Sequence, residues 1–176
     1  MLRRIAGFTL IELLASVAVL TILLVIALPS FAGLKQRSAV TATHNLLLTG
    51  FATARNHAVS TGHLVTICPV RGESGCRADG VWDEGWMVFV DHNRNGRLDA
   101  DDTVVHHENR IAGGIGIYSG RGRPRAVFRP DGSAAGTNLS LRICADGAVQ
   151  SAVILSNVGR ARSASTGELA TLGNCG

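Results

Sequence analysis

The sequence predicts an α+β fold in which one long N-terminal helix is followed by an antiparallel, β-rich domain. Three observations predict it. Residues 8–28 form a nearly continuous apolar run of 21 residues, and apolar side chains recur at helical spacing through residues 30–62. From residue 63 onward, short apolar or alternating segments are separated by Gly, Asp, Asn and Pro, which is typical of strands and turns.

The apolar run predicts a membrane-spanning helix over residues 8–29. At ~1.5 Å per residue, a helix of this length crosses a hydrocarbon core of about 30 Å. Arg3 and Arg4 precede it, so the amino end is expected in the cytoplasm and the rest of the chain on the other side. A cleaved signal peptide would have a shorter apolar core that ends at a small residue, whereas here Gly7 precedes the run.

Glu12 is a charged residue near the start of this run. Because a charged side chain at the centre of a bilayer costs roughly 2.5–3.5 kcal/mol, Glu12 is expected to have a partner. Cleavage after Gly7 would create an amino group on Phe8, about one helical turn from Glu12, and the amine of a neighbouring subunit is the predicted partner. The alternative is an ordinary anchor whose Glu12 reaches the membrane interface.

The stretch Gly7-Phe8-Thr9-Leu10-Ile11-Glu12 after a basic leader resembles the processing site of type IV prepilins. The resemblance implies a type IV pilin-like fold and a leader, residues 1–7, removed by the prepilin peptidase, with N-methylation of Phe8. It also implies assembly through the N-terminal helix with other pilins or pseudopilins. Before assembly, the chain would be a single-pass inner-membrane protein with its head in the periplasm.

Residues 30–62 are predicted to continue the helix as an amphipathic outer half that packs on the head. Gly62 is the predicted stop. The apolar positions at helical spacing are Phe31, Leu34, Val40, Leu47, Phe51, Ala54 and Ala58.

Residues 63–176 are predicted to form one β-rich head domain. The expected strands cover residues 63–70, 85–91, 103–107, 114–119, 126–129, 139–145 and 150–160.

Four cysteines, Cys68, Cys76, Cys144 and Cys175, all lie in this head. An even number in an exported domain favours disulfides, and three pairings are possible. Pairing Cys68 with Cys76 would close a short polar loop, and pairing Cys144 with Cys175 would fix the carboxyl tail; we favour this arrangement. A zinc site is the alternative, although no short Cys-x-x-Cys spacing supports it.

Within the pilin superfamily, several segments resemble the GspH/FimT family of minor pilins and pseudopilins. They are residues 54–59, 65–68 and 85–91 and the late Gly159-Arg160-Ala161-Arg162. The resemblance implies one of two functions: a GspH-like minor pseudopilin with a structural role in type II secretion, or a FimT-like minor pilin that binds DNA during natural transformation. The Gly-Arg-x-Arg tetrapeptide matches the motif of the DNA-binding members, which implies DNA contacts by Arg160 and Arg162.

The charge distribution also favours DNA. Residues 63–108 carry four arginines and nine acidic residues, whereas residues 110–162 carry eight arginines and two. In an extended segment Arg121, Arg123 and Arg125 would point the same way, and guanidinium groups suit phosphate oxygens. Few aromatic residues could stack on bases, so we expect binding without sequence preference. The alternative is a solvated basic face.

Residues 91–102 match the spacing of a calcium-binding loop, with candidate oxygen ligands on Asp91, Asn93, Asn95, Asp99 and Asp102. However, Asp replaces the usual final Glu and the flanks are predicted strands. The alternative is a turn rich in Asx residues. No other cofactor is expected, and we predict no enzyme, because the sequence lacks a nucleophile elbow, a metal-ligand cluster and a phosphate-binding glycine loop before a helix.

Overall fold

The computed structural model describes residues 9–72, 75–109, 111, 113–120, 122–134, 136 and 138–175; for residues 26–30 it describes the backbone alone. The chain divides into two compact units, residues 1–38 and 39–176. Gly7 and Phe8, the predicted cleavage and methylation positions, lie outside the described residues.

One helix, α1 (Leu10–Thr61), runs through both units and has nearly the predicted bounds. Its start is held by a reciprocal capping box. The backbone N–H of Thr9 donates to Glu12 Oε2 at 3.2 Å, and the backbone N–H of Glu12 donates to Thr9 Oγ1 at 3.3 Å. Its end is at Gly62, as predicted, where a φ of +72° favours glycine.

In the first unit, the large apolar side chains of α1 between Leu10 and Val25 are exposed. Among the residues that the structure describes, no helix has an apolar stretch long enough to cross a membrane. The predicted span, residues 8–29, includes Phe8 and residues whose side chains are not described, so the span stays a prediction.

In the second unit, α1 buries the apolar stripe that the sequence predicts. Leu47, Phe51, Ala54 and Ala58 are buried in the main core. The prediction is wrong for Phe31 and Leu34, which are exposed. They belong to the first unit, in which the described residues, 9–38, form no element other than the helix, so no other described element of that unit covers them.

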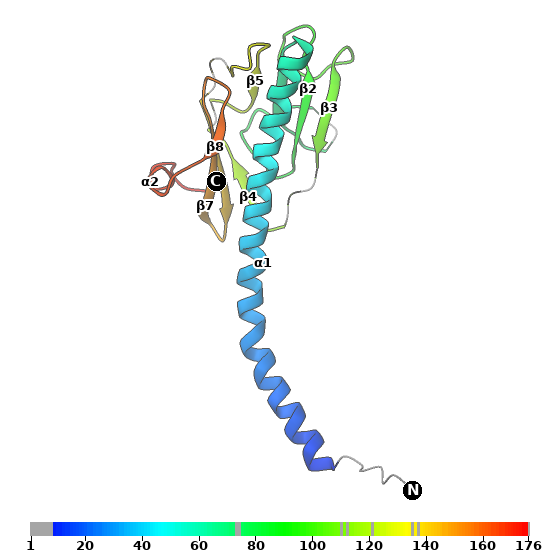
Figure 1. The fold of residues 1–176 in the computed structure, drawn as a ribbon, viewed down its shortest axis with the longest axis vertical. Coiled ribbons are helices and arrows are strands. Elements are labelled where there is room, and N and C mark those ends of the chain that lie inside the picture. The colour runs from blue at the N-terminus through cyan, green and yellow to red at the C-terminus, as the bar shows by residue number, and fades with distance from the viewer. Residues whose placement is uncertain are drawn as a thin grey trace. The chain divides into compact units, whose positions relative to one another are not determined.

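The head contains two four-stranded antiparallel sheets (Figure 1). The first has the order β3-β2-β1-β5 and the second the order β4-β6-β7-β8. Both sheets and α1 contribute to one apolar core, in which Phe51, Trp82 and Phe128 are among the largest buried side chains. The strands are β1 (Val65–Pro69), β2 (Trp86–Val90), β3 (Thr103–Glu108), β4 (Gly116–Tyr118), β5 (Ala126–Phe128), β6 (Leu139–Ala145), β7 (Ala148–Leu155) and β8 (Ala161–Ser163).

Six of the seven predicted strands are confirmed with small shifts at their ends, but the last one is wrong as a single strand. β7 ends at Leu155, the chain reverses, and β8 returns antiparallel to β7, with Leu155 opposite Ala161. The reversal is closed by the N–H of Gly159, which donates to the carbonyl of Ser156 at 2.8 Å. A short helix, α2 (Thr166–Leu169), follows and was not predicted.

His44 links α1 to the second sheet. Its two ring nitrogens are hydrogen-bonded to Ser151 on β7 and Ser163 on β8, each at 2.8 Å. Burial lowers the pKa of the His44 imidazole. The C-terminal part of α1 is therefore attached to β7 and β8 by polar contacts as well as by the core.

Both favoured disulfides are confirmed. Cys68 is bonded to Cys76, with Cα atoms 5.5 Å apart, and Cys144 is bonded to Cys175, with Cα atoms 6.0 Å apart. Because all four cysteines are bonded in pairs, the alternative of a cysteine-based zinc site is wrong.

Candidate functional site

The arginines predicted to contact DNA lie at separate places in the head. Arg121 lies outside the described residues. Arg162 lies in β8 of the second sheet, and Arg160 directly precedes that strand. Arg123 and Arg125 precede β5 of the first sheet. The two pairs of arginines therefore lie at different sheets and have different neighbouring residues.

Gly159 positions the pair at β8. Its φ is +77°, and a Cβ atom there would lie 1.9 Å from the carbonyl oxygen of Gly132. Only glycine fits this turn without displacement of the backbone. Beyond the turn, Ala161 packs against the core, so Arg162, the next residue of β8, projects from the opposite face of the strand.

Arg160 is exposed and lines a groove of about 270 Å³ between α1 and the β7–β8 turn. The apolar part of the groove comes from Leu48, Phe51 and Ala52 of α1, and Arg55 also lines it. No acidic side chain within the described part of the chain forms an ion pair with Arg160 or Arg55. The groove is thus lined by apolar residues of α1 and by two arginines that form no ion pair with a described carboxylate.

Arg55 was not among the predicted contacts. Its Nε donates to the carbonyl of Gly132 at 3.0 Å, which places the arginine beside the turn that Gly159 also contacts. The exposed Arg129 belongs to the same turn, since the N–H of Gly132 donates to its carbonyl at 2.8 Å. A signal for Arg55 was present: it lies four residues after Phe51 and so borders the buried stripe of α1.

Arg162 has a strong partner. Its Nη2 lies 2.6 Å from Glu168 Oε1 and its Nη1 donates to Glu168 Oε2 at 2.9 Å. Glu168 also accepts from the N–H and hydroxyl of Ser165, forming the capping box of α2. These hydrogen bonds, the one from Arg162 first, lower the pKa of the Glu168 carboxyl to about 2. Arg162 is therefore paired with a carboxylate, and a phosphate would have to displace Glu168 to bind the same two Nη groups.

Arg123 and Arg125 do not point the same way, in contrast to the predicted alternation. Arg123 Nη1 donates to the carbonyl of Gly136. The guanidinium of Arg125 lies against Gly96, where a Cβ atom would be 2.8 Å from its Nη2. The reason is local: the N–H of Arg123 donates to the carbonyl of Gly120, so the segment begins with a turn rather than a strand.

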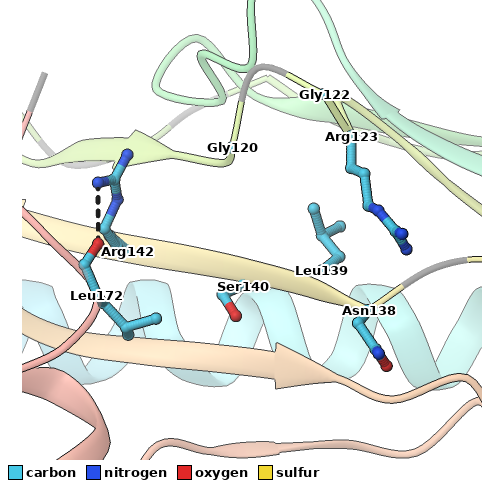
Figure 2. Close-up of a pocket in the computed structure, with 8 residues that line it drawn as sticks. All are labelled: Gly120, Gly122, Arg123, Asn138, Leu139, Ser140, Arg142 and Leu172. Atoms are coloured by element: carbon cyan, nitrogen blue, oxygen red, sulfur yellow. Dashed lines mark hydrogen bonds between the residues drawn. The ribbon is translucent and has the colours of Figure 1, made fainter.

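Arg123 instead lines a second groove, of about 370 Å³, together with Arg142 of β6 (Figure 2). Arg142 Nη1 donates to the carbonyls of Leu172 at 3.1 Å and Asn174 at 2.8 Å. The carboxyl tail is thus held against β6 by Arg142 as well as by the Cys144–Cys175 bond.

The candidate calcium ligands are engaged with one another and with the loop backbone. Asp91 is buried and accepts from the N–H groups of Asn95 and Gly96. Asp99 accepts from the side-chain amides of Asn93 and Asn95, which lower its pKa. Asp102 accepts from the N–H groups of His92 and Asp99.

Nowhere in the described part of the chain do three or more acidic, histidine or cysteine side chains converge as a metal site would require. The loop geometry therefore fits an Asx-rich turn, and calcium binding stays a prediction that gains no support from it.

Comparison with known proteins identifies two matching family models. One, described as type II transport protein GspH, matches residues 43–159, and the other, described as a prokaryotic N-terminal methylation motif, matches residues 2–28. The first match ends at Gly159, so Arg160 and Arg162 lie beyond it. No curated protein matches the sequence.

Two crystal structures of the type IV minor pilin FimU from Pseudomonas aeruginosa strain PAO1 are similar in fold. The form in space group P21 has a TM-score of 0.58 at 15% identity and covers 76% of this chain and 94% of FimU. The form in space group P65 has a TM-score of 0.50 at 15% identity and covers 74% and 94%. The similarity establishes the arrangement of one long helix on a β-rich head.

Proposed function

The chain belongs to the GspH family of type II transport proteins, and from this premise we propose that it is a minor type IV pilin that binds DNA through arginines during natural transformation. The proposed contact surface is the groove between α1 and β8, with Arg160 and Arg55 as the main contacts and Arg162 as a further one. Arg123 and Arg125 would add positive charge at a distance from this groove.

The observation that carries the proposal is the pairing of Arg55 and Arg160 at one groove without an acidic partner among the described side chains. Guanidinium groups form paired hydrogen bonds with phosphate oxygens, so two of them can hold adjacent phosphates. Such contacts do not distinguish bases, and binding would be independent of sequence.

The test is the affinity of the full chain, in detergent, for a labelled 30-base-pair duplex at several salt concentrations. Each lost phosphate contact should reduce the log–log salt slope by about 0.9. We expect Arg160→Ala and Arg55→Gln each to weaken binding several-fold and to lower this slope. Arg160→Ala combined with Arg162→Ala should leave the head folded and also reduce transformation.

Arg71→Ala is the matched control, because it removes the same charge from an arginine that already pairs with Glu84 at 3.1 Å. Equal losses for Arg160→Ala and Arg71→Ala would mean that net charge alone attracts DNA, and this would contradict the proposed groove.

A second candidate function is a minor pseudopilin with a structural role in type II secretion. Two observations favour it: the description of the matching family, and the carboxylate of Glu168 that already holds Arg162. If the parent chain binds no DNA even at low salt, this second function replaces the first.

In either function, we propose that the helix joins the chain to other subunits. The prepilin peptidase would cleave after Gly7 within the matched methylation motif, and the chain would reside in the inner membrane before assembly. The amine of Phe8 on a neighbouring subunit would then pair with Glu12, because each charge is costly to bury without the other.

A further inference from the structure

The second groove lies along an edge of β6 that β4 leaves open. β4 pairs only with the C-terminal part of β6, from Arg142 to Cys144. β6 itself begins at Leu139, so its first three residues have no strand beside them on that side. At about 3.3 Å per residue, the open edge is about 10 Å long. The groove of about 370 Å³ lies there, between this edge and the chain at Gly120 and Gly122.

The hydrogen-bonding groups of Ser140 face the groove. The backbone N–H of Trp82 donates to the carbonyl of Ile117, and the backbone N–H of Ser119 donates to the carbonyl of Gly80. The backbone N–H and carbonyl of Ile117 therefore point away from β6. By alternation, Tyr118 must hydrogen-bond with its partner Arg142 on β6. Ser140, two residues before Arg142, presents its N–H and carbonyl on the same side.

No described residue hydrogen-bonds to the backbone N–H or carbonyl of Ser140 on this side. β7 does not use them either, because the same alternation makes the pairing of Ser140 with Ile154 a non-hydrogen-bonded one. The groove therefore contains one backbone donor and one backbone acceptor, spaced as a further strand requires.

The charge at the groove is positive. The side chains of Arg123 and Arg142 lie on either side of Ser140 (Figure 2). The wider region, residues 110–162, has eight arginines and two acidic residues. A ligand for this groove should therefore be acidic at its ends and should both donate and accept hydrogen bonds at its centre.

We propose that this groove binds an extended, acidic segment of a partner protein, which adds to β6 as a short strand in line with β4. A peptide backbone supplies the donor and acceptor that Ser140 requires. The backbone of DNA offers acceptors but no donor, so the edge favours a peptide over DNA. The inference does not depend on the proposed DNA groove, which lies between α1 and β8.

The experiment measures binding of a fluorescein-labelled peptide, Glu-Val-Thr-Val-Glu, to the full chain in detergent by fluorescence anisotropy. We expect saturable binding, weakened at least tenfold when alternate peptide nitrogens are N-methylated and weakened several-fold by Arg123→Ala. Ser140→Pro should also reduce the affinity for the peptide at least tenfold, because it removes the backbone N–H that faces the groove. Ser140→Ala keeps that N–H and should bind as the parent does.

Three outcomes would overturn the proposal: no binding of the peptide at millimolar concentration, equal binding of the N-methylated peptide, or equal loss with Ser140→Pro and Ser140→Ala. The N-methylated peptide is tested on the parent chain, so this arm remains informative even if Ser140→Pro does not fold. DNA binding measured on the two Ser140 variants, which keep every arginine, should be unchanged, and this separates the groove beside β6 from the proposed DNA contact.

Discussion

Arg162 and Glu168 form a two-point ion pair in which each guanidinium Nη faces one carboxylate oxygen, at 2.6 and 2.9 Å. This geometry is the one that a guanidinium adopts with a phosphate. Glu168 thus occupies the position that a phosphate oxygen pair would take at Arg162. The Gly-Arg-x-Arg motif consequently contains two unlike arginines: Arg160 lines a groove, and Arg162 is held by a carboxylate.

The first prediction concerns Glu168→Gln. The amide retains an oxygen for the capping box of α2 but loses the charge that binds Arg162. We expect the affinity of the full chain for duplex DNA to rise two- to fivefold at low salt, as measured by fluorescence anisotropy.

Glu84→Gln is the control, since it removes the same charge from a carboxylate that pairs with Arg71 and Arg77. A gain of equal size in both variants would trace the effect to net charge rather than to release of Arg162.

The second prediction is a pH dependence of stability. The pKa of Glu168 falls from 4.5 to about 2 in the folded chain, so between these values the unfolded chain binds more protons. The contribution of Glu168 to the free energy of unfolding should therefore be fully present above pH 4.5 and should be lost as the pH falls through 2. Urea unfolding at pH 2–5 should show a smaller pH dependence for Glu168→Gln than for the parent chain. If the pH dependence of unfolding is identical for Glu168→Gln and the parent chain, the lowered pKa of Glu168 is contradicted.

The third prediction concerns Gly159→Ala. The new Cβ would lie 1.9 Å from the carbonyl oxygen of Gly132, in addition to the strain of a φ of +77°. We expect a loss of about 3 kcal/mol or more in the free energy of unfolding, measured with urea. Gly147→Ala is the control: its φ is +73° but nothing lies within 4 Å, so only the conformational cost of roughly 1–2 kcal/mol should appear. Equal losses would show that the contact with Gly132 has no effect.

The fourth prediction compares the two disulfides. They join residues 8 and 31 positions apart, and by loop-closure entropy the Cys144–Cys175 bond should contribute about 3.5 kcal/mol and the Cys68–Cys76 bond about 2.5 kcal/mol. Replacing each pair by serine and measuring urea unfolding should give the larger loss for the 144–175 pair. The reverse order would indicate that the shorter loop has lost native contacts as well as its bond.

Sequence patterns predicted the elements whose determinants are local. The strand at residues 139–145 follows from its alternating apolar residues, and the end of α1 follows from Gly62 after the buried stripe at Phe51. The cysteine pairing could also be predicted from the sequence, because one pair closes a short loop and the other fixes the tail.

What the sequence could not provide were contacts between distant segments. The apolar residues at 150–160 are compatible with one long strand, and the turn at Gly159 is recognisable only from its approach to Gly132. The partnership of Arg162 with Glu168 depends on the position of α2, which the sequence analysis missed. Arg55 joins Arg160 only because α1 and β8 pack together.

The Cys144–Cys175 bond also imposes an order of events on the chain. Leu172, three residues before Cys175, forms one side of the groove beside β6, and its carbonyl is bound by Arg142. A reduced tail would keep its hydrogen bonds to Arg142 but would lose its covalent link to β6. We therefore expect the groove beside β6 to reach its final geometry only after Cys144 and Cys175 are oxidised. A newly synthesised chain in a reducing compartment would not yet have the complete binding surface for a partner.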